Sequence, residues 1–271
     1  MPELPEVESV LRQLRPSLVG RRIERVAFTP QERFADLERA EGSVVTGLRR
    51  RGKYLLAELT PDGHPADREL VMHLGMTGAF RFHGPDWRGD AYVRARFTLD
   101  DGVLDFRDVR RFGRLVVVAA GDYAGIPTLR QLGPEPLSDG FTAAGFAGAL
   151  ARTRMPMKPF LLTQRPVAGV GNIYADEALW RARISPRSRR VGPERAARLR
   201  AAIRDVLTEA IEREGTTFRD YQMVNGESGR NADFLVAYGQ EGRPCPRCAT
   251  PLRKITLGGR GTTYCPSCQA R

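Results

Sequence analysis

Four cysteines near the C-terminal end restrict the possible folds of this chain most strongly. Cys245 and Cys248 form one C-x2-C pair, and Cys265 and Cys268 form a second pair after 16 intervening residues. Two pairs at this spacing are typical of a tetrahedral four-thiolate zinc site, which is closed by its protein ligands and therefore structural. A glycine-rich turn lies between two short extended runs here, so the sequence predicts a zinc-bound β-hairpin.

Two disulfide bonds or four idle thiols are the alternatives for these cysteines. The chain has no apolar run of membrane-spanning length, and its acidic, proline-containing start is unlike a signal peptide. We therefore expect a cytoplasmic protein that does not associate with a membrane. That compartment is reducing and the chain has no other cysteine, so both alternatives are disfavoured.

The charge balance indicates a polyanionic partner. Lys and Arg number 43 while Asp and Glu number 32, which gives a net charge of +11. A protein from an arginine-rich proteome could carry this charge without binding nucleic acid, so position matters more than the total. Residues 242–271 contain six basic residues and no acidic one. This local block favours a nucleic-acid partner.

Hydrophobic periodicity divides the rest of the chain into a strand-rich half and a helical half. Apolar residues at helical spacing predict a helix over residues 5–18. Short β-branched or aromatic runs predict strands at 23–28, 44–50, 54–59, 70–73, 79–83, 92–99, 103–106 and 114–118. Helical patterns follow at 142–151, 156–163, 173–183 and 193–213. The sequence thus predicts an α+β multidomain protein that begins with a β-sandwich or flattened barrel.

The first residues form a candidate covalent catalytic centre. If Met1 is removed, Pro2 becomes a secondary amine beside the Glu3 carboxylate, at the positive end of the first predicted helix. That positive end disfavours protonation of the amine, and an amine must be neutral to attack. Most N-termini only fray, so these residues taken alone favour no function.

Two further stretches have an ordinary and a functional interpretation. Residues 169–172 place two glycines and Asn172 at the start of a helix, where backbone N–H groups could bind a phosphate. Taken alone, this pattern is more typical of a tight helix–helix turn with an asparagine cap. Residues 223–233 are polar, contain glycine and lack an apolar face, which predicts a mobile loop.

Together these stretches resemble the formamidopyrimidine-DNA glycosylase family from residue 2 to residue 269. The matching motifs are PELPEVE at 2–8, KYLL at 53–56, HLGMTG at 73–78, RRFG at 110–113, LGPEPL at 132–137, GVGNIYA at 169–175 and the four-cysteine hairpin. The resemblance implies an N-terminal β-sandwich with an N-terminal helix at 1–126 and a linker at 127–140. A helix–two-turn–helix domain at 141–240 and the zinc β-hairpin at 241–271 would follow.

The resemblance also implies base-excision repair of damaged double-stranded DNA by a monomeric bacterial enzyme of the cytoplasm and nucleoid. Such an enzyme removes 8-oxoguanine and formamidopyrimidines through a Schiff base on Pro2, and then cleaves the strand by β,δ-elimination. Glu3 would be the general acid–base partner. Lys53 would act in β-elimination and Arg260 in δ-elimination. The four cysteines would hold one structural Zn2+ ion.

The other implied roles concern the DNA duplex and the damaged base. A base that leaves the stack leaves a gap, and Met76, Arg110 and Phe112 match the residues that fill it. Without the sequence context, a core position would be the ordinary interpretation of this methionine and phenylalanine. Two acidic positions match the surroundings of the substrate pocket, although support of helices explains them equally well. The remaining matches are Lys158, Asn172 and Arg154 as DNA contacts and Glu6 and Glu177 as the acidic positions.

Two other functions remain open. The sister branch of endonuclease VIII-like enzymes removes oxidised pyrimidines and has the same zinc hairpin and Pro-Glu start. The Leu4-Pro5 continuation and the context of Met76 favour the purine branch. A non-catalytic damaged-DNA-binding protein would use the same motifs without chemistry. Residues 88–92 lack a histidine that relatives carry as a DNA contact, and the predicted loop also differs, which leaves the fine lesion preference open.

Overall fold

The computed structural model describes residues 1–61, 65–218 and 223–269. The chain divides into two units. Unit 1 comprises Met1–Arg130 and Glu214–Arg230, and unit 2 comprises Gln131–Arg213 and Asn231–Arg271. We call Glu214–Arg230 the return segment, because the chain comes back to unit 1 there. In the described ranges, no helix has both the length and the apolar character that crossing a bilayer requires.

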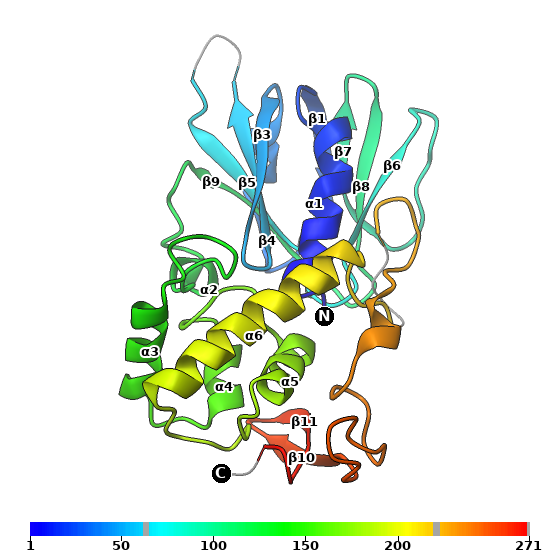
Figure 1. Ribbon diagram of the computed structural model, residues 1–271. Helices are drawn as coiled ribbons and strands as arrows, with labels where there is room; N and C mark the ends of the chain where they lie inside the picture. The colour runs from blue at the N-terminus through cyan, green and yellow to red at the C-terminus, as the bar shows by residue number, and fades with distance from the viewer. Residues whose placement is uncertain (62–64, 219–222, 270–271) are drawn as a thin grey trace. The chain divides into compact units, whose positions relative to one another are not determined.

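Unit 1 contains two β-sheets (Figure 1). One sheet has the strand order β1-β7-β8-β6 and the other has the order β2-β9-β5-β4-β3. All pairings are antiparallel except that of β2 with β9. The strands are β1 (Ile23–Phe28), β2 (Phe34–Ala35), β3 (Val44–Arg51), β4 (Tyr54–Thr60), β5 (Arg68–His73), β6 (Ala79–His83), β7 (Val93–Leu99), β8 (Gly102–Arg107) and β9 (Arg114–Ala119).

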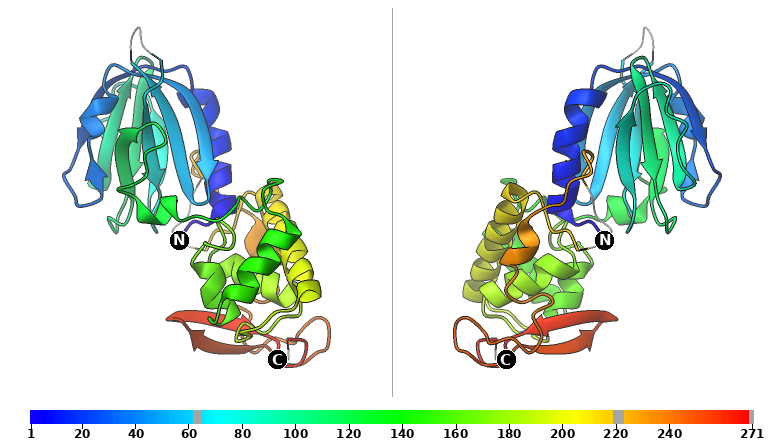
Figure 2. Two further views of the ribbon diagram at one scale, coloured as in Figure 1. Left: turned by 90° about the vertical axis from the view of Figure 1, so that its left-hand side faces the viewer. Right: turned by 90° about the vertical axis from the view of Figure 1, so that its right-hand side faces the viewer.

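The helix α1 (Leu4–Leu18) completes the core of unit 1. Pro5 occupies its first turn, and Glu3 and Glu6 form a capping box at its start. Its apolar face, which includes Val7 and Leu14, packs in one buried cluster with side chains from both sheets. Figure 2 shows α1 running along one side of the two sheets. Packing of the helix therefore fixes the position of the chain's first residues.

Unit 2 consists mainly of helices and one β-hairpin. In Figure 2 the hairpin lies against the helices of this unit. Its strand β11 contacts α5, which also packs on α4 and α6. The elements are α3 (Ala143–Arg152), α4 (Met157–Leu162), α5 (Asn172–Arg181), α6 (Pro193–Glu212), η2 (Asn231–Phe234), β10 (Arg253–Leu257) and β11 (Arg260–Tyr264), while η1 (Leu37–Ala40) and α2 (Pro127–Arg130) belong to unit 1.

The predicted fold class is confirmed. Each predicted helix and strand is present, with boundaries that differ by one or two residues. The two units nevertheless divide the chain differently from the expected domains, because the return segment groups with unit 1. Met223 explains this grouping, since it is only 1% exposed within the apolar core of unit 1. The composition of residues 223–233 shows a polar stretch, but it does not show that the Met223 side chain packs in the core of unit 1.

Candidate active site and nucleic-acid interface

The N-terminal turn of unit 1 holds the proposed nucleophile and its proton partner. Pro2 is buried, and Glu3 is 2% exposed at the cap of α1. The backbone N–H of Glu3 donates to Oε2 of Glu6 at 2.7 Å. The first residues are therefore held in one position and do not fray.

Lys53 lies at the turn between β3 and β4 and is 3% exposed. Burial and the nearby cations Lys53 and Arg114 lower the pKa of His73 to about 3, so its imidazole is neutral at physiological pH. The Nδ1 atom of that imidazole accepts a hydrogen bond from the N–H of Gly75 at 3.0 Å. The charge of Lys53 thus acts on His73, and His73 holds the turn before Met76. The sequence analysis did not select His73 as a site residue.

The three residues predicted to fill the gap in DNA lie on two turns that are fastened to each other. The carboxylate of Asp108 accepts from the hydroxyl of Thr77 at 2.5 Å and from the N–H of Gly113 at 2.7 Å. A side chain at Gly75 would meet the backbone of Phe112, because a Cβ atom there would lie 2.5 Å from its carbonyl carbon. Met76 on one turn is therefore held close to the other turn.

The second of these turns presents a cation on an aromatic ring. The guanidinium of Arg110 lies 4.9 Å from the centre of the Phe112 ring, and Phe112 is 40% exposed. The predicted cation and the predicted wedge therefore lie in contact with each other, and the aromatic ring is accessible to solvent.

In unit 2, Asn172 begins α5 after the turn that contains Gly169 and Gly171. Gly169 has a φ of +80°, and its N–H donates to Oε1 of Gln164 at 2.9 Å. The Oδ1 atom of Asn172 is buried and has no hydrogen-bond partner among the residues that the structure describes. The predicted asparagine cap is wrong, because Gly171 is the N-cap residue and no side chain caps the helix. The unpartnered oxygen of Asn172 is instead a polar atom that a ligand could engage.

The predicted phosphate contact of Lys158 is not supported by its position. Lys158 is fully buried, and its Nζ lies 2.7 Å from Oδ1 of Asp176 and 2.9 Å from the carbonyl oxygen of Gly261. The other Asp176 oxygen accepts from the N–H of Thr263 at 3.0 Å. Burial raises the pKa of Asp176 to about 7 against the lowering effect of Lys158. The pair joins α4 and α5 to β11, which accounts for the burial of Lys158 without a phosphate.

Arg260 lies at the tip of the hairpin and is exposed. It pairs with Leu257 across a two-residue turn in which Gly258 and Gly259 have φ values of +58° and +73°. Such a turn requires positive φ at both central residues, which glycine adopts without strain. The glycines therefore allow a tight tip that presents the arginine to solvent.

A hollow of about 290 Å³ lies beside this hairpin in unit 2. Sequence reasoning selected only Asn172 among its lining residues. Lys254 belongs to the basic block at 242–271, but its local sequence pattern does not distinguish it from the other cations there. The sequence around Tyr238 contains no pattern that indicates a binding residue. The full lining is Asn172, Tyr238, Gly239, Glu241, Lys254, Gly261 and Thr263.

Glu6 and Glu177, the two predicted pocket residues, both bind backbone N–H groups. The Oε1 atom of Glu6 accepts from Thr216 at 2.7 Å, in the return segment. In unit 2, Oε1 of Glu177 accepts from Ala237 and Tyr238, each at 2.8 Å. Burial raises the pKa of Glu177, while these N–H groups lower it. The capping alternative fits Glu6, which belongs to the capping box of α1, whereas Glu177 binds N–H groups outside the helices.

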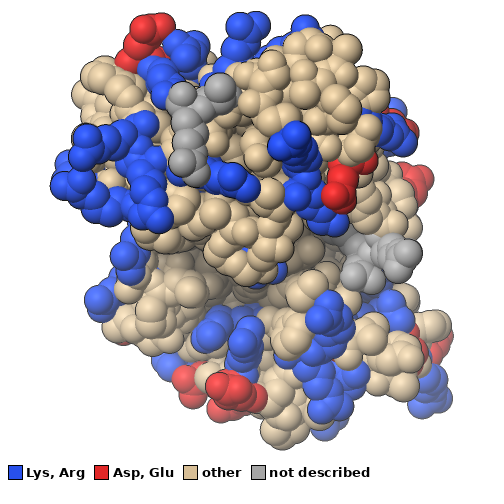
Figure 3. Space-filling model, turned by 90° about the horizontal axis from the view of Figure 1, so that it is seen from below, with Lys and Arg blue, Asp and Glu red and all other residues tan. Residues whose placement is uncertain are grey.

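Cations gather on the surface, as the charge balance predicted. Figure 3 shows many more Lys and Arg than Asp and Glu side chains on the face seen from below. Arg154 is exposed, and its carbonyl oxygen accepts from Nη1 of Arg189 at 2.9 Å. A hollow of about 330 Å³ in unit 2 is lined by arginines and one serine, namely Arg187, Ser188, Arg189, Arg190 and Arg195.

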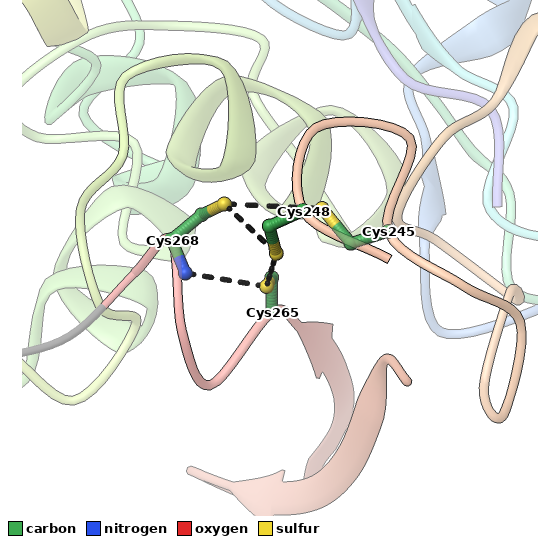
Figure 4. A group of neighbouring side chains, drawn as sticks. All are labelled: Cys245, Cys248, Cys265 and Cys268. Carbon is green, nitrogen blue, oxygen red and sulfur yellow. Dashed lines mark hydrogen bonds between the residues drawn. The ribbon is translucent and has the colours of Figure 1, made fainter. Parts of the chain in front are cut away.

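The four cysteines converge at the end of the hairpin (Figure 4). Their sulfur atoms all lie within 4.8 Å of one another, and the Sγ atoms of Cys248 and Cys265 are 3.5 Å apart. A tetrahedron with Zn–S bonds of about 2.3 Å has sulfur–sulfur edges of about 3.8 Å. The donor set and its spacing therefore fit one zinc ion closed by four thiolates. Gln269 fastens this end to the helices by donating to the carbonyl oxygen of Ile184 at 3.0 Å.

Family comparisons cover the chain in three consecutive parts. Residues 1–115 match the formamidopyrimidine-DNA glycosylase N-terminal domain. Residues 132–222 match the formamidopyrimidine-DNA glycosylase H2TH domain, and residues 242–271 match a zinc finger found in FPG and IleRS.

Full-length relatives are also similar. A formamidopyrimidine-DNA glycosylase of Deinococcus radiodurans is 48% identical over 279 residues, covering 99% of this chain and 97% of that protein. The crystal structure of the MutM (FPG) protein from Thermus thermophilus has a TM-score of 0.92 at 45% identity, covering 100% of this chain and 99% of that one. A Lactococcus lactis FPG variant in complex with Fapy-dG-containing DNA has a TM-score of 0.90 at 34% identity, covering 100% of each chain.

Proposed function

The chain belongs to the formamidopyrimidine-DNA glycosylase family, and from this premise we propose the activity of the protein. It is a base-excision repair enzyme that removes oxidised purines, chiefly 8-oxoguanine and formamidopyrimidines, and then cleaves the strand at the abasic site. The observation that carries this proposal is the buried Pro2–Glu3 turn within a chain that matches the family from end to end. We further propose that it acts as a monomer in the cytoplasm, on DNA of the nucleoid.

The proposed chemistry begins with removal of Met1, which otherwise acylates the Pro2 nitrogen. The free secondary amine attacks C1′ of the damaged nucleoside and displaces the base, with Glu3 as proton partner. The sugar ring opens and leaves an iminium ion between Pro2 and C1′. This cation acidifies the C2′ proton, which prepares the strand for β-elimination. Intact-mass measurement of the active protein tests the requirement for Met1 removal.

The cations of the site would stabilise and orient the DNA backbone. We assign β-elimination and a phosphate contact to Lys53, and δ-elimination and a phosphate contact to Arg260. A guanidinium suits the second role because its fork can bind one phosphate through two hydrogen bonds. Asn172 and Arg154 are proposed as further phosphate contacts, whereas Lys158 is reassigned to fastening the hairpin.

The duplex would be held open by the two fastened turns of unit 1. Met76 and Phe112 would fill the space of the extruded base, and Arg110 would face the orphan cytosine. The zinc ion, held by the four cysteines, has a structural role in keeping the hairpin folded, so that Arg260 has a defined position.

Borohydride trapping on DNA with an abasic site tests the central proposal. Reduction of the iminium should give a covalent complex with the Met1-free protein, and the Pro2→Gly and Glu3→Gln variants should lose most of it. Absence of a trapped complex with Met1-free protein would instead support the non-catalytic DNA-binding protein. Comparing release of 8-oxoguanine with release of thymine glycol from matched duplexes tests the substrate class. A preference for thymine glycol would support the endonuclease VIII-like alternative.

A further inference from the structure

The connection between α5 and α6, residues 182–192 of unit 2, carries most of the arginines around one hollow. The hollow measures about 330 Å³ and is lined by Arg187, Ser188, Arg189, Arg190 and Arg195. Arg195 lies in the first turn of α6, and the other three arginines are exposed on the connection. Figure 2 shows this connection close to the hairpin, and the guanidinium of Arg187 lies 5.7 Å from the centre of the Tyr264 ring. Four cations therefore surround one place in unit 2.

The positive charge of the hollow is not balanced by acidic side chains. Within the part of the chain that the structure describes, none of the four arginines forms an ion pair, and the lining contains no carboxylate. The acid nearest in sequence, Glu194, pairs with Arg198 at 2.7 Å. The first turn of a helix also carries partial positive charge, which disfavours cations there. An anion in the hollow would relieve both sources of repulsion.

The backbone around the hollow is fixed by hydrogen bonds. The N–H of Met157 donates to the carbonyl oxygen of Ser188 at 2.8 Å, and the N–H of Lys158 donates to that of Pro186 at 3.1 Å. Both bonds join the connection to the start of α4. The N–H of Ser188 donates in turn to the carbonyl oxygen of Ser185 at 3.0 Å. The walls are thus held in place before a ligand binds, which reduces the entropy that binding costs.

One buried polar side chain in the lining has no partner. Ser188 is 8% exposed, and its hydroxyl makes no hydrogen bond to any residue that the structure describes. Arg189 uses Nη1 for the carbonyl oxygen of Arg154, at 2.9 Å, and keeps its other N–H groups for a ligand. A hydroxyl and several guanidinium groups are the donors that bind phosphate oxygens. The hollow therefore offers hydrogen-bond donors and positive charge together.

We propose that this hollow binds backbone phosphates of duplex DNA, outside the segment that Asn172 and Arg260 are proposed to contact. The inference rests on the proposed function only in taking DNA as the ligand. The lining has no aromatic ring on which a base could stack and no apolar side chain that could anchor a peptide. The contact is therefore with the phosphate backbone, and it does not depend on the DNA sequence.

The hollow is separate from the phosphate contacts already assigned in unit 2. Asn172 is the first of the 10 residues of α5, and the connection follows the other end, about 15 Å away at 1.5 Å per residue. Arg260 begins β11, whereas Tyr264, on which Arg187 stacks, ends it. These two residues are about 13 Å apart at 3.3 Å per residue. Changes at the hollow should therefore leave the assigned contacts intact.

The first test removes two cations from the hollow. The guanidinium groups of Arg190 and Arg195 make no hydrogen bond or ion pair with described residues, so Arg190→Gln combined with Arg195→Gln should not disturb the fold. Arg21→Gln combined with Arg198→Gln is the matched control, because it removes the same net charge. Both control arginines pair with acidic side chains away from the hollow.

The second test adds a negative charge and should not weaken the fold. Gly192 is the N-cap residue of α6, and a Cβ atom there would meet nothing within 4 Å. An aspartate at this position can cap the helix, so Gly192→Asp should stabilise α6 while it opposes the cations on either side. Gly125→Asp is the control, since a Cβ atom at Gly125 also meets nothing within 4 Å.

The measurement is fluorescence anisotropy of an undamaged duplex with the full-length, Met1-free proteins at several salt concentrations. Loss of two phosphate contacts should reduce the slope of log affinity against log salt by about 1.8. This corresponds to about tenfold to thirtyfold weaker binding at about 0.15 M salt. Gly192→Asp should also weaken binding, and both controls should change the affinity less than their test variants. Single-turnover release of 8-oxoguanine at saturating protein should match the parent in all variants.

Three outcomes would overturn the inference. One is an unchanged slope in the Arg190 and Arg195 variant, and another is an equal change in its control, which would assign the effect to net charge. The third is calorimetric binding of inorganic pyrophosphate that this variant loses while its slope with DNA stays that of the parent, which would make the hollow a site for small anions. Failure of the unaltered protein to release any base would contradict the proposed function, whereas the slopes with undamaged DNA would still decide the role of the hollow.

Discussion

Lys53 in unit 1 and Lys158 in unit 2 are both buried lysines, but their surroundings differ. Each belongs to a stretch that resembles the family, and each is buried, at 3% and 0% exposure. Lys158 is compensated by the Asp176 carboxylate at 2.7 Å, whereas the charge of Lys53 helps to lower the pKa of His73. A buried lysine with its own carboxylate fastens elements together.

Removal of zinc should give the largest difference in stability between the two units. Chelation should unfold the hairpin region of unit 2, because structural zinc sites contribute about 10–16 kcal/mol to folding. Unit 1 contains none of the four ligands and should retain its protection. Hydrogen exchange of peptides from residues 245–268 and from β4 and β5 measures the difference. Equal loss of protection in both sets would show that the units do not respond separately.

Lys158→Met sharpens the comparison of the two lysines. It leaves Asp176 buried without its cation, which should cost about 3–5 kcal/mol of unfolding free energy. Adding Asp176→Leu should recover much of this loss, because the buried charge is then gone as well. Urea unfolding of the single and double variants measures both steps, and Lys53→Met serves as the comparison in unit 1. A double variant no more stable than Lys158→Met would contradict the pairing.

Acidification should lower the stability of unit 1 through His73 and raise the stability of unit 2 through Asp176. The pKa of His73 is depressed, so its contribution to stability is present above pH 6.5 and declines as pH falls toward 3, by about 1.4 kcal/mol per pH unit at most. The pKa of Asp176 is raised, so its contribution is present below pH 3.8 and is lost as pH rises through about 7.

His73→Asn tests the first of these contributions. Asparagine keeps an acceptor for the Gly75 N–H but cannot titrate in this range. Unfolding free energies measured between pH 4 and pH 7 should therefore fall less steeply on acidification in the variant than in the parent. An unchanged slope would mean that His73 does not control the acid response of unit 1.

Arg260→Ala is expected to have the smallest effect of this series. Loss of one phosphate contact should reduce the slope of log affinity against log salt by about 0.9. Fluorescence anisotropy with a damaged duplex at several salt concentrations measures the slope. Arg198→Ala is the control, because Arg198 pairs with Glu194 on α6. Equal changes in the two variants would indicate that net charge alone sets the slope.

The parts of the fold that follow local patterns could be predicted from the sequence. The spacing of Cys245, Cys248, Cys265 and Cys268 predicts their convergence, because each pair forms a short local turn. The strands of unit 1 and the helix that starts at Leu4 follow from short-range periodicity in the same way.

The features that depend on distant residues could not be predicted in this way. Burial of Met223 depends on contacts with residues about two hundred positions earlier, such as Gln13. The reassignment of Lys158 depends on Asp176, whose position in a helix looks like an ordinary exposed acid until β11 packs against it. The capping alternative for Glu6 was visible, but its contact with Thr216 was not.

The return segment also has a consequence for synthesis of the protein. The chain passes between the two units at residues 130/131, 213/214 and 230/231. The core of unit 1 is incomplete until Met223 has left the ribosome, although most of that unit is translated first. Nascent unit 1 should therefore have an open place in its core while unit 2 emerges. Consider a chimera that keeps this chain up to about residue 130 and takes the rest from a relative. Its unit 1 core would contain the relative's side chain at the position of Met223.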